Sequence, residues 1–171
     1  MKMLLLRLTL DCADTEASCL RSAANDAGYE VSELRSPVSK NRLEVALSEY
    51  APAKFDAIYV AAHGGCEGIT ESAQNTQNGI TWETLGLLLK PLCGAPSAMV
   101  VLGCCTGSCG AMNATKRLQS ECSCVVWAPC TSVSSSQTCE ALRTILPATN
   151  GSNDEIVDKL SRSKICYRAA I

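Results

Sequence analysis

The sequence predicts an α/β fold, in which a parallel β-sheet is covered by helices on both faces. Short apolar runs alternate along the chain with segments of helical character, which is typical of parallel sheets. The apolar runs are continuous, as in strands that are buried on both faces. The chain has 171 residues, 47% of them hydrophobic, which suits one domain with a full aliphatic core. We therefore expect a single domain over residues 1–171.

Five apolar runs bounded by turn-forming residues are the expected strands. They are Met3–Leu10, Tyr29–Leu34, Phe55–Ala62, Ala98–Cys104 and Cys124–Ala128. The first run resembles the start of a signal peptide. However, Arg7 interrupts it and no small-residue cleavage site follows, so we interpret it as a buried strand.

Six segments between the strands have the periodicity or the end signals of helices. They are Asp14–Ala27, Ser39–Tyr50, Thr81–Leu89, Ala111–Gln119, Ser134–Ile145 and Ser152–Ser161. Asp14 is expected to cap the first helix, Gly28 to terminate it, and Thr81 to cap the third.

One polar stretch, Gly64–Gly79, has neither pattern. It is long for a plain connection between elements. It predicts either a small hairpin flanked by Ile69 and Ile80 or a mobile functional loop.

The composition excludes several classes of partner. Fifteen basic residues nearly balance 17 acidic ones, so we expect no basic surface for nucleic acid. Aromatic residues make up 4% of the chain, too few for the stacking surfaces that bind single strands. No apolar run approaches the length of a membrane span, and Asp11 before Cys12 is a poor context for lipidation. We expect a cytoplasmic protein that binds no nucleic acid and no membrane, with free thiols outside the site.

The candidate catalytic residues follow two of the expected strands. Ligands of parallel sheets bind beyond the carboxyl ends of the strands. There the third strand leads into His63, the only histidine, and the fourth leads into Cys104 and Cys105. If these strands are neighbours, an imidazole and a thiol meet at one edge, as a Cys–His dyad requires. The imidazole would activate the thiol and later protonate the leaving amine.

The choice of nucleophile and its supporting groups follows from position. Cys105 is expected to react rather than Cys104, which still belongs to the strand and is packed under a helix, because buried thiols are inert. The backbone amides of Gly64 and Cys105 are the expected oxyanion hole. Asp56 lies at the far end of the histidine strand, about 23 Å from His63, and cannot orient it.

Two short motifs resemble the caspase-like cysteine peptidases of clan CD, most closely their CHAT type. Ile58–Gly64 resembles the strand that ends in the catalytic histidine of this family, and Val100–Gly107 resembles the strand that ends in its catalytic cysteine. The second motif is similar to the caspase pattern Gln-Ala-Cys-x-Gly and to the CHAT pattern Leu-Ser-Ala-Cys. Ile80–Leu85 and Val125–Trp127 are similar to the helix start and the later strand of the family.

The resemblance implies a caspase-like three-layer sandwich with a mostly parallel sheet of about six strands. It also implies a cysteine endopeptidase that needs no cofactor and acts on a protein or peptide substrate. An activating or regulatory protein partner is left open.

The resemblance places the pocket for the residue before the cut at the ends of the first, fourth and fifth strands. The candidate substrate-binding residues there are Asp11, Cys104, Thr106, Gly107, Cys130 and Thr131. No Arg or Lys stands at these ends, whereas Asp11 offers a carboxylate. We therefore expect cleavage after a basic or small neutral residue rather than after Asp.

Two other functions stay open. One is a catalytically inactive caspase-like module that binds partners or acts as a scaffold. The other is a thiol redox or zinc module. Its ligands would be Cys104, Cys105 and Cys109, or Cys122, Cys124 and Cys130, with His63 as a fourth ligand. Because no pair of Cys-x-x-Cys motifs occurs, we expect no metal site.

Overall fold

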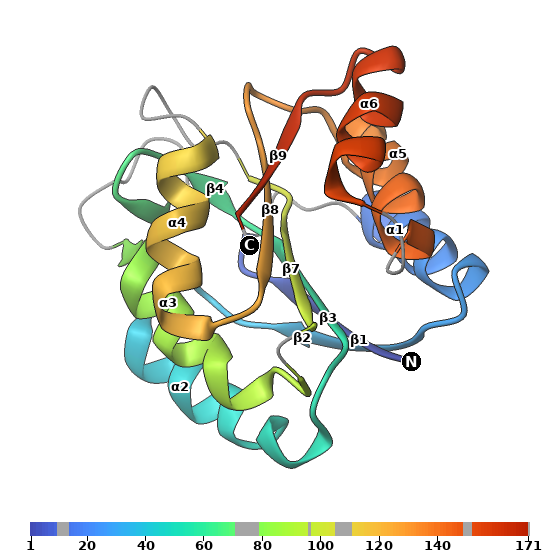
Figure 1. The fold of residues 1–171 in the computed structure, drawn as a ribbon. Coiled ribbons are helices and arrows are strands. Elements are labelled where there is room, and N and C mark those ends of the chain that lie inside the picture. The colour runs from blue at the N-terminus through green and yellow to red at the C-terminus, as the bar shows by residue number, and fades with distance from the viewer. Residues whose placement is uncertain (10–13, 71–78, 96, 105–110, 149–151, 171) are drawn as a thin grey trace.

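The computed structural model describes residues 1–171 except 10–13, 71–78, 96, 105–110, 149–151 and 171 (Figure 1). Its main sheet has six strands in the order β2-β1-β3-β7-β8-β9. These strands are β1 (Lys2–Arg7), β2 (Glu30–Arg35), β3 (Ala57–Ala61), β7 (Met99–Leu102), β8 (Val125–Pro129) and β9 (Tyr167–Ala170). Neighbouring strands pair in parallel, except β8 and β9, which are antiparallel. The predicted α/β fold with a mostly parallel sheet of about six strands is confirmed.

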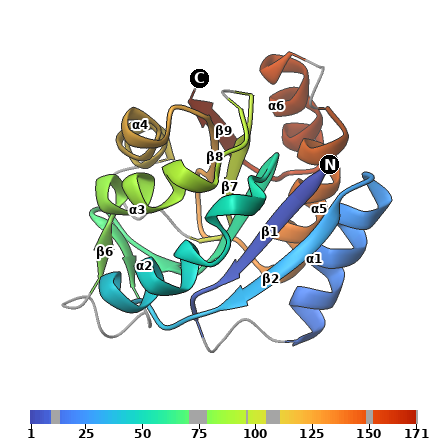
Figure 2. The same ribbon diagram turned by 90° about the horizontal axis from the view of Figure 1, so that it is seen from below.

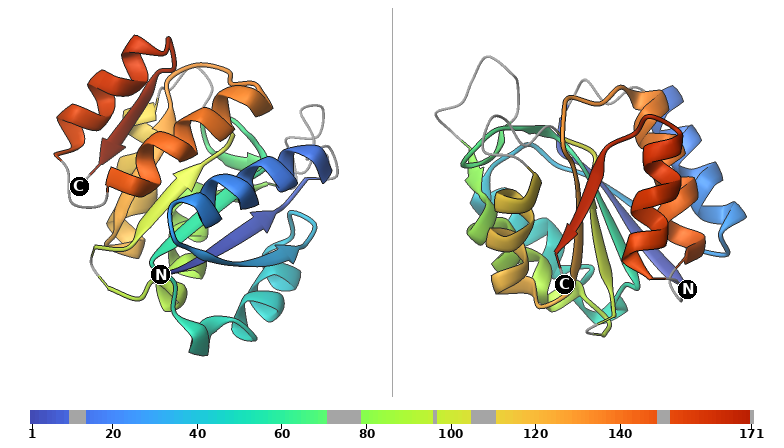
Figure 3. Two further views of the ribbon diagram at one scale, coloured as in Figure 1. Left: turned by 90° about the vertical axis from the view of Figure 1, so that its right-hand side faces the viewer. Right: turned by 45° about the horizontal axis from the view of Figure 1, so that its top comes forward.

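Helices cover both faces of this sheet (Figures 1 and 2). One face carries α1 (Asp14–Asp26), α5 (Ser135–Ile145) and α6 (Asn153–Arg162), and the other carries α2 (Lys40–Ser48), α3 (Trp82–Leu89) and α4 (Ala111–Cys122). Short 3-10 turns follow three of these helices: η1 (Ala51–Ala53), η2 (Lys90–Leu92) and η4 (Leu146–Ala148). Figure 3 shows the resulting three layers, with β9 at one edge of the sheet.

Strand β1 shows why the apolar runs are continuous. Successive side chains of a strand point to opposite faces of the sheet. Met3 and Leu5 pack in the core under α1, α5 and α6, whereas Leu4 and Leu6 pack in the core under α2, α3 and α4. All four side chains are fully buried, so both faces of β1 are apolar at these positions.

A second, small sheet follows β3. It consists of β4 (His63–Gly64), β5 (Gly68–Thr70) and β6 (Ile80–Thr81), paired in antiparallel fashion in that order. Ile69 lies opposite Ile80, as expected for a hairpin flanked by these two residues. The predicted hairpin is therefore present as β5 and β6. A second hairpin, formed by β4 and β5, precedes it and begins at His63.

Several element ends agree with the sequence signals. Gly28 has a φ of 82°, and the Tyr29 amide behind it donates to the Ala24 carbonyl, so α1 ends as predicted. The Thr84 amide donates to Thr81 Oγ1 at 3.2 Å, which confirms the cap of α3. Asp14, by contrast, is the first residue of α1 rather than its cap, and its carboxylate binds arginines instead.

Two strands differ from the prediction. Strand β1 ends at Arg7 rather than Leu10, because its partners β2 and β3 end opposite Arg7, at Arg35 and Ala61. Strand β9 is absent from the five expected strands. As an antiparallel edge strand it buries Tyr167 and exposes Arg168, so it has no continuous apolar run. None of the described helices has the length and apolar character to cross a membrane.

The expectation that cysteines outside the site are free thiols is wrong for at least three of them. Cys130 and Cys166 form a disulfide with a Cα–Cα distance of 5.3 Å, and Cys66 is also disulfide-bonded. Cys130 follows β8 and Cys166 precedes β9. Pairing of these two strands therefore brings the two cysteines within bonding range. The disulfide could not be predicted from the sequence, because β9 was not among the expected strands.

Candidate functional site

The carboxyl ends of β3 and β7 define the candidate site. The two strands are parallel neighbours, and Val60 lies opposite Leu102 in the last pair of their register. His63 follows Val60 by three residues, and Cys105 follows Leu102 by three residues. The condition that these two strands are neighbours is therefore met. Cys105 itself lies outside the described residues, as do Asp11, Thr106 and Gly107.

His63 is held by the small sheet rather than by a loop. It is the first residue of β4, is half-buried, and lies opposite Thr70 of β5. The hairpin closes with a hydrogen bond of 2.9 Å from the Gly65 amide to the Gly68 carbonyl. Side chains on paired strands are placed more precisely than those on loops. Strand pairing therefore fixes the backbone from which the imidazole extends, at the edge of the main sheet.

The backbone amide of Gly64 is not used in the pairing of β4 with β5. Hydrogen-bonded and non-hydrogen-bonded pairs alternate along an antiparallel ladder. Gly65 and Gly68 form a hydrogen-bonded pair, so Gly64 and Ile69 form the next, non-hydrogen-bonded one. The Gly64 amide consequently points away from β5, on the side of β4 where the described part of the small sheet has no further strand.

Arg117 of α4 ties this hairpin to the helical layer. Its guanidinium donates to both carboxylate oxygens of Glu83 on α3, to the Cys66 carbonyl at 3.3 Å and to Glu67 at 3.1 Å. The hydrogen bond from Arg117 lowers the pKa of Glu83 below its ordinary value. The indole of Trp82 adds a hydrogen bond of 3.0 Å to the same Cys66 carbonyl. The turn of the hairpin is thus fixed by two elements on one face of the sheet.

The segment that leads to Cys105 is closely packed. The Gly103 amide donates to the Val60 carbonyl at 2.9 Å, which extends the pairing of β7 with β3 by one step. A Cβ atom on Gly103 would lie 2.0 Å from the hydroxyl oxygen of Tyr59. Cys104 is 2% exposed, so it is buried as predicted, although it lies two residues beyond the end of β7. Its side chain therefore has almost no surface to offer to a substrate.

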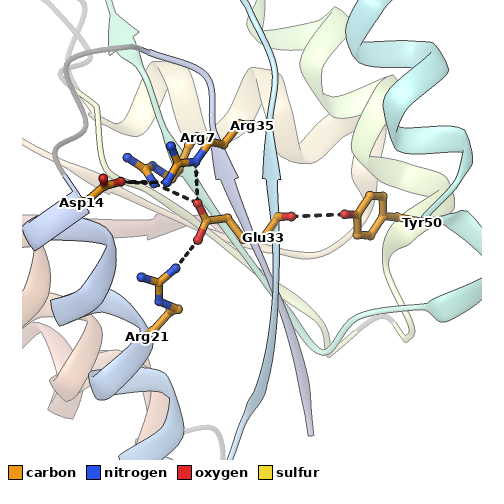
Figure 4. A network of polar contacts seen from close by, with 6 residues as sticks. All are labelled: Arg7, Asp14, Arg21, Glu33, Arg35 and Tyr50. Carbon is orange, nitrogen blue, oxygen red and sulfur yellow. Dashed lines mark hydrogen bonds and ion pairs between the residues drawn. The ribbon is translucent and has the colours of Figure 1, made fainter.

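A network of five charged side chains occupies the ends of β1 and β2 at the same edge of the sheet (Figure 4). Arg7 is 6% exposed and donates to Glu33 at 2.9 Å and to Asp14 at 3.0 Å. Arg35 binds the same two carboxylates, and Arg21 also binds Glu33. Burial raises the pKa of Glu33, but the hydrogen bonds from Arg7 and Arg35 outweigh it and hold the pKa below its ordinary value.

This network corrects one premise about the substrate pocket. The first strand was expected to end without an Arg or Lys, but β1 ends at Arg7 and β2 ends at Arg35. Both guanidiniums are engaged by Glu33 and Asp14. A cation at a strand end is therefore present, and its charge is compensated by two neighbouring carboxylates.

The end of β8 contributes the remaining predicted residues. Cys130 is half-buried and joined to Cys166, and Thr131 is exposed. The proposed zinc ligands Cys122, Cys124 and Cys130 are not brought together, because Cys124 and Cys130 lie at opposite ends of β8 and Cys130 is oxidised. Among the residues that the structure describes, no group of three or more His, Cys, Asp or Glu side chains is arranged to hold a metal ion.

Two further features adjoin the hairpin or the histidine strand. A hollow of about 220 Å³ lies over β5 and β6, lined by residues 67–70 and 79–81. Asp56 stands before the start of β3, where its carboxylate accepts a hydrogen bond of 2.8 Å from the Lys2 amide. It is thus at the end of the strand opposite to His63, as predicted. Neither the family models nor the curated proteins compared with this chain gave a match.

Proposed function

We propose that this chain is a caspase-like cysteine endopeptidase of the CHAT type, with Cys105 as nucleophile and His63 as the group that transfers protons. One observation carries the proposal: β3 and β7 are parallel neighbours, and His63 and Cys105 each follow the last register pair by three residues. Three residues of chain span at most about 10 Å, so His63 and Cys105 are each within that reach of the end of the β3–β7 pairing.

The chemistry of such a pair is acyl transfer. The Cys105 thiolate attacks the carbonyl carbon of the peptide bond, and the oxyanion that forms accepts hydrogen bonds from the Gly64 and Cys105 amides. His63 then gives its proton to the leaving amine, and a thioester remains on Cys105. Attack by water on the thioester releases the second product. The outward direction of the Gly64 amide supports the role of this donor.

The substrate is proposed to be a protein or peptide cut after a basic or small neutral residue. The compensation of Arg7 and Arg35 by Glu33 and Asp14 supports this choice, because a carboxylate substrate would have to compete with two carboxylates already bound. Asp11 is the proposed acid of the pocket. The cytoplasmic location expected from the sequence stays a prediction.

The decisive experiment screens a diverse peptide library with the wild-type chain and with matched variants. Cys105→Ala is expected to abolish cleavage, whereas Cys104→Ala should retain most of it, since that thiol is buried. His63→Ala should abolish cleavage, and Asp56→Asn should change only the melting temperature. Asp11→Ala should weaken the preference for basic residues.

Three outcomes would contradict the proposal. Activity that survives in Cys105→Ala but is lost in Cys104→Ala would move the nucleophile. A purely catalytic defect in Asp56→Asn would give that carboxylate a role in the site. Peptide binding without turnover, in a folded wild-type chain whose Cys105 ignores a peptidyl electrophile, would favour an inactive binding module.

A further inference from the structure

Three cysteines meet at the end of the main sheet opposite to the candidate site. Cys122 is the last residue of α4, Cys124 precedes β8, and Cys93 follows η2. The Sγ atoms of Cys122 and Cys124 are 2.9 Å apart. The Cys93 thiol donates to the Leu89 carbonyl at 3.5 Å and is close enough to both other thiols for their titrations to be linked. We refer to these three residues as the thiol cluster.

The backbone explains why the cluster forms. Ser123 has a φ of 55°, in the left-handed region, and its amide donates to the Gln119 carbonyl at 2.9 Å. This turn ends α4 and places the thiols of Cys122 and Cys124 side by side. Cys93 forms a parallel bridge with Phe55, just before β3, and so lies at the same end of the main sheet as Cys124, which precedes β8.

The three thiols are not equivalent. Cys122 and Cys124 are buried, whereas Cys93 is partly exposed. Hydrogen bonds from Cys124 lower the pKa of Cys93 and of Cys122, and the nearby charge of Lys54 lowers the pKa of Cys93 further. The same hydrogen bonds raise the pKa of Cys124. The most accessible of the three thiols is therefore also one whose pKa is lowered, and the thiolate is the reactive species in exchange with disulfides.

The spacing suits sulfur–sulfur bonding better than a shared metal ion. Two thiolates on one tetrahedral zinc ion lie about 3.8 Å apart, given bonds of about 2.3 Å. The sulfur atoms of Cys122 and Cys124 are nearly 1 Å closer, at 2.9 Å. Formation of a disulfide between them needs only a small further approach.

We propose that the thiol cluster is a dithiol–disulfide site that is oxidised by a small disulfide of the glutathione type. The Cys93 thiolate attacks one sulfur of the small disulfide, forms a mixed disulfide and releases one small thiol. Cys124, as a thiol, then attacks Cys93 Sγ and passes its proton to the departing sulfur, so the second small thiol is released. Cys122 finally attacks Cys124 Sγ, which leaves a Cys122–Cys124 disulfide and returns Cys93 to the thiol form.

Electrons and protons balance over these three steps. Two protein thiols lose two electrons and two protons, and one small disulfide becomes two small thiols. The site is separate from His63 and Cys105, so the inference does not depend on the peptidase proposal.

A second pair of thiols in the structure provides the comparison. Cys19 of α1 and Cys139 of α5 are neighbours on the other face of the sheet, where Cys19 accepts a hydrogen bond of 3.6 Å from Arg143. Burial and the hydrogen bond with Cys19 raise the pKa of Cys139 to about 12. In the described part of the chain, no third thiol contributes to the titration of Cys139. We therefore expect it to react much more slowly than the thiol cluster.

The experiment incubates the full chain with glutathione disulfide and maps each thiol by alkylation before and after reduction, with mass spectrometry. In the wild type, Cys122 and Cys124 should become oxidised together, while Cys93 is again a thiol at equilibrium. Cys93→Ser should slow this oxidation at least tenfold without changing its end point. Cys122→Ser should stop the sequence at a Cys93–Cys124 disulfide. Cys139→Ser is the control and should behave as the wild type.

The mapping of the wild type needs no variant, so a folding defect cannot hide the answer, and circular dichroism verifies each variant. The proposal is overturned if Cys122 and Cys124 stay reduced while Cys19 and Cys139 oxidise. It is also overturned if Cys93→Ser oxidises at the wild-type rate, since Cys93 would then not be the entry point.

Discussion

At the residue scale, Gly103 is the position with the least freedom on the path to Cys105. A Cβ atom there would lie 2.0 Å from the hydroxyl oxygen and 2.4 Å from Cζ of Tyr59, which is fully buried and has no room to move aside. We expect Gly103→Ala to destabilise the protein by about 3 kcal/mol, measured by urea unfolding.

Gly65→Ala is the matched control for this prediction. No atom lies within 4 Å of a Cβ placed on Gly65, so its stability should change by less than about 1 kcal/mol. Equal stability of the two variants would show that the chain around Gly103 relaxes freely.

Among single residues, the sequence predicted the position of those whose type and place along the chain are distinctive. His63 is the only histidine and directly follows a strand, so its place at the sheet edge could be predicted. The role of Arg7 could not, because in the sequence it is only an interruption of an apolar run. Its carboxylate partner Glu33 lies on another strand, and the sequence around Arg7 does not indicate that the two residues form an ion pair.

At the element scale, the hairpin that carries His63 depends on Arg117. This side chain joins α4 to Glu83 of α3 and to the Cys66 carbonyl in the hairpin turn. We expect Arg117→Gln to cost about 1–2 kcal/mol of stability and to speed amide hydrogen exchange across residues 63–70.

Lys116→Gln removes a neighbouring exposed cation from the same helix and should leave this exchange unchanged. If both variants exchange alike, the hairpin is held by its own strand pairing instead. A peptidase assay on the same variants would then show whether a looser hairpin lowers turnover.

The elements themselves were predictable in proportion to their burial. Strands covered on both faces are apolar over most of their length, which is why β1, β3, β7 and β8 could be found from their apolar runs. Their ends depend on the lengths of their partners, and edge strand β9 needs only one apolar face. The thiol cluster was equally hidden, because Cys93 joins Cys122 and Cys124 from a distant part of the chain.

At the scale of the whole molecule, the network around Glu33 joins two strands and a helix and sets the response to acid. Folding lowers the pKa of Glu33 below its ordinary value of 4.5, so the native state favours the charged carboxylate. The stability from this group is present above that value and is lost as the pH falls through the lower native pKa. We expect Glu33→Gln to be about 2 kcal/mol less stable than the wild type near pH 7.

The difference between the two proteins should shrink towards zero in acid, when the wild-type carboxylate is also neutral. Thermal unfolding across the range from pH 7 to about pH 3 measures it. Glu44→Gln, at an exposed carboxylate of α2, should match the wild type throughout. A gap between Glu33→Gln and the wild type that persists unchanged in acid would mean that packing, rather than charge, is lost.

The strand order across the main sheet also bears on how the chain folds while it is being synthesised. After β1 has paired with β2 on one side, β3, β7, β8 and β9 are added on the other side in the order in which the ribosome produces them. Each strand of the main sheet after β1 therefore has at least one partner that is already translated. Each nascent edge stays open only while one connection is made, which limits the time for pairing with another chain.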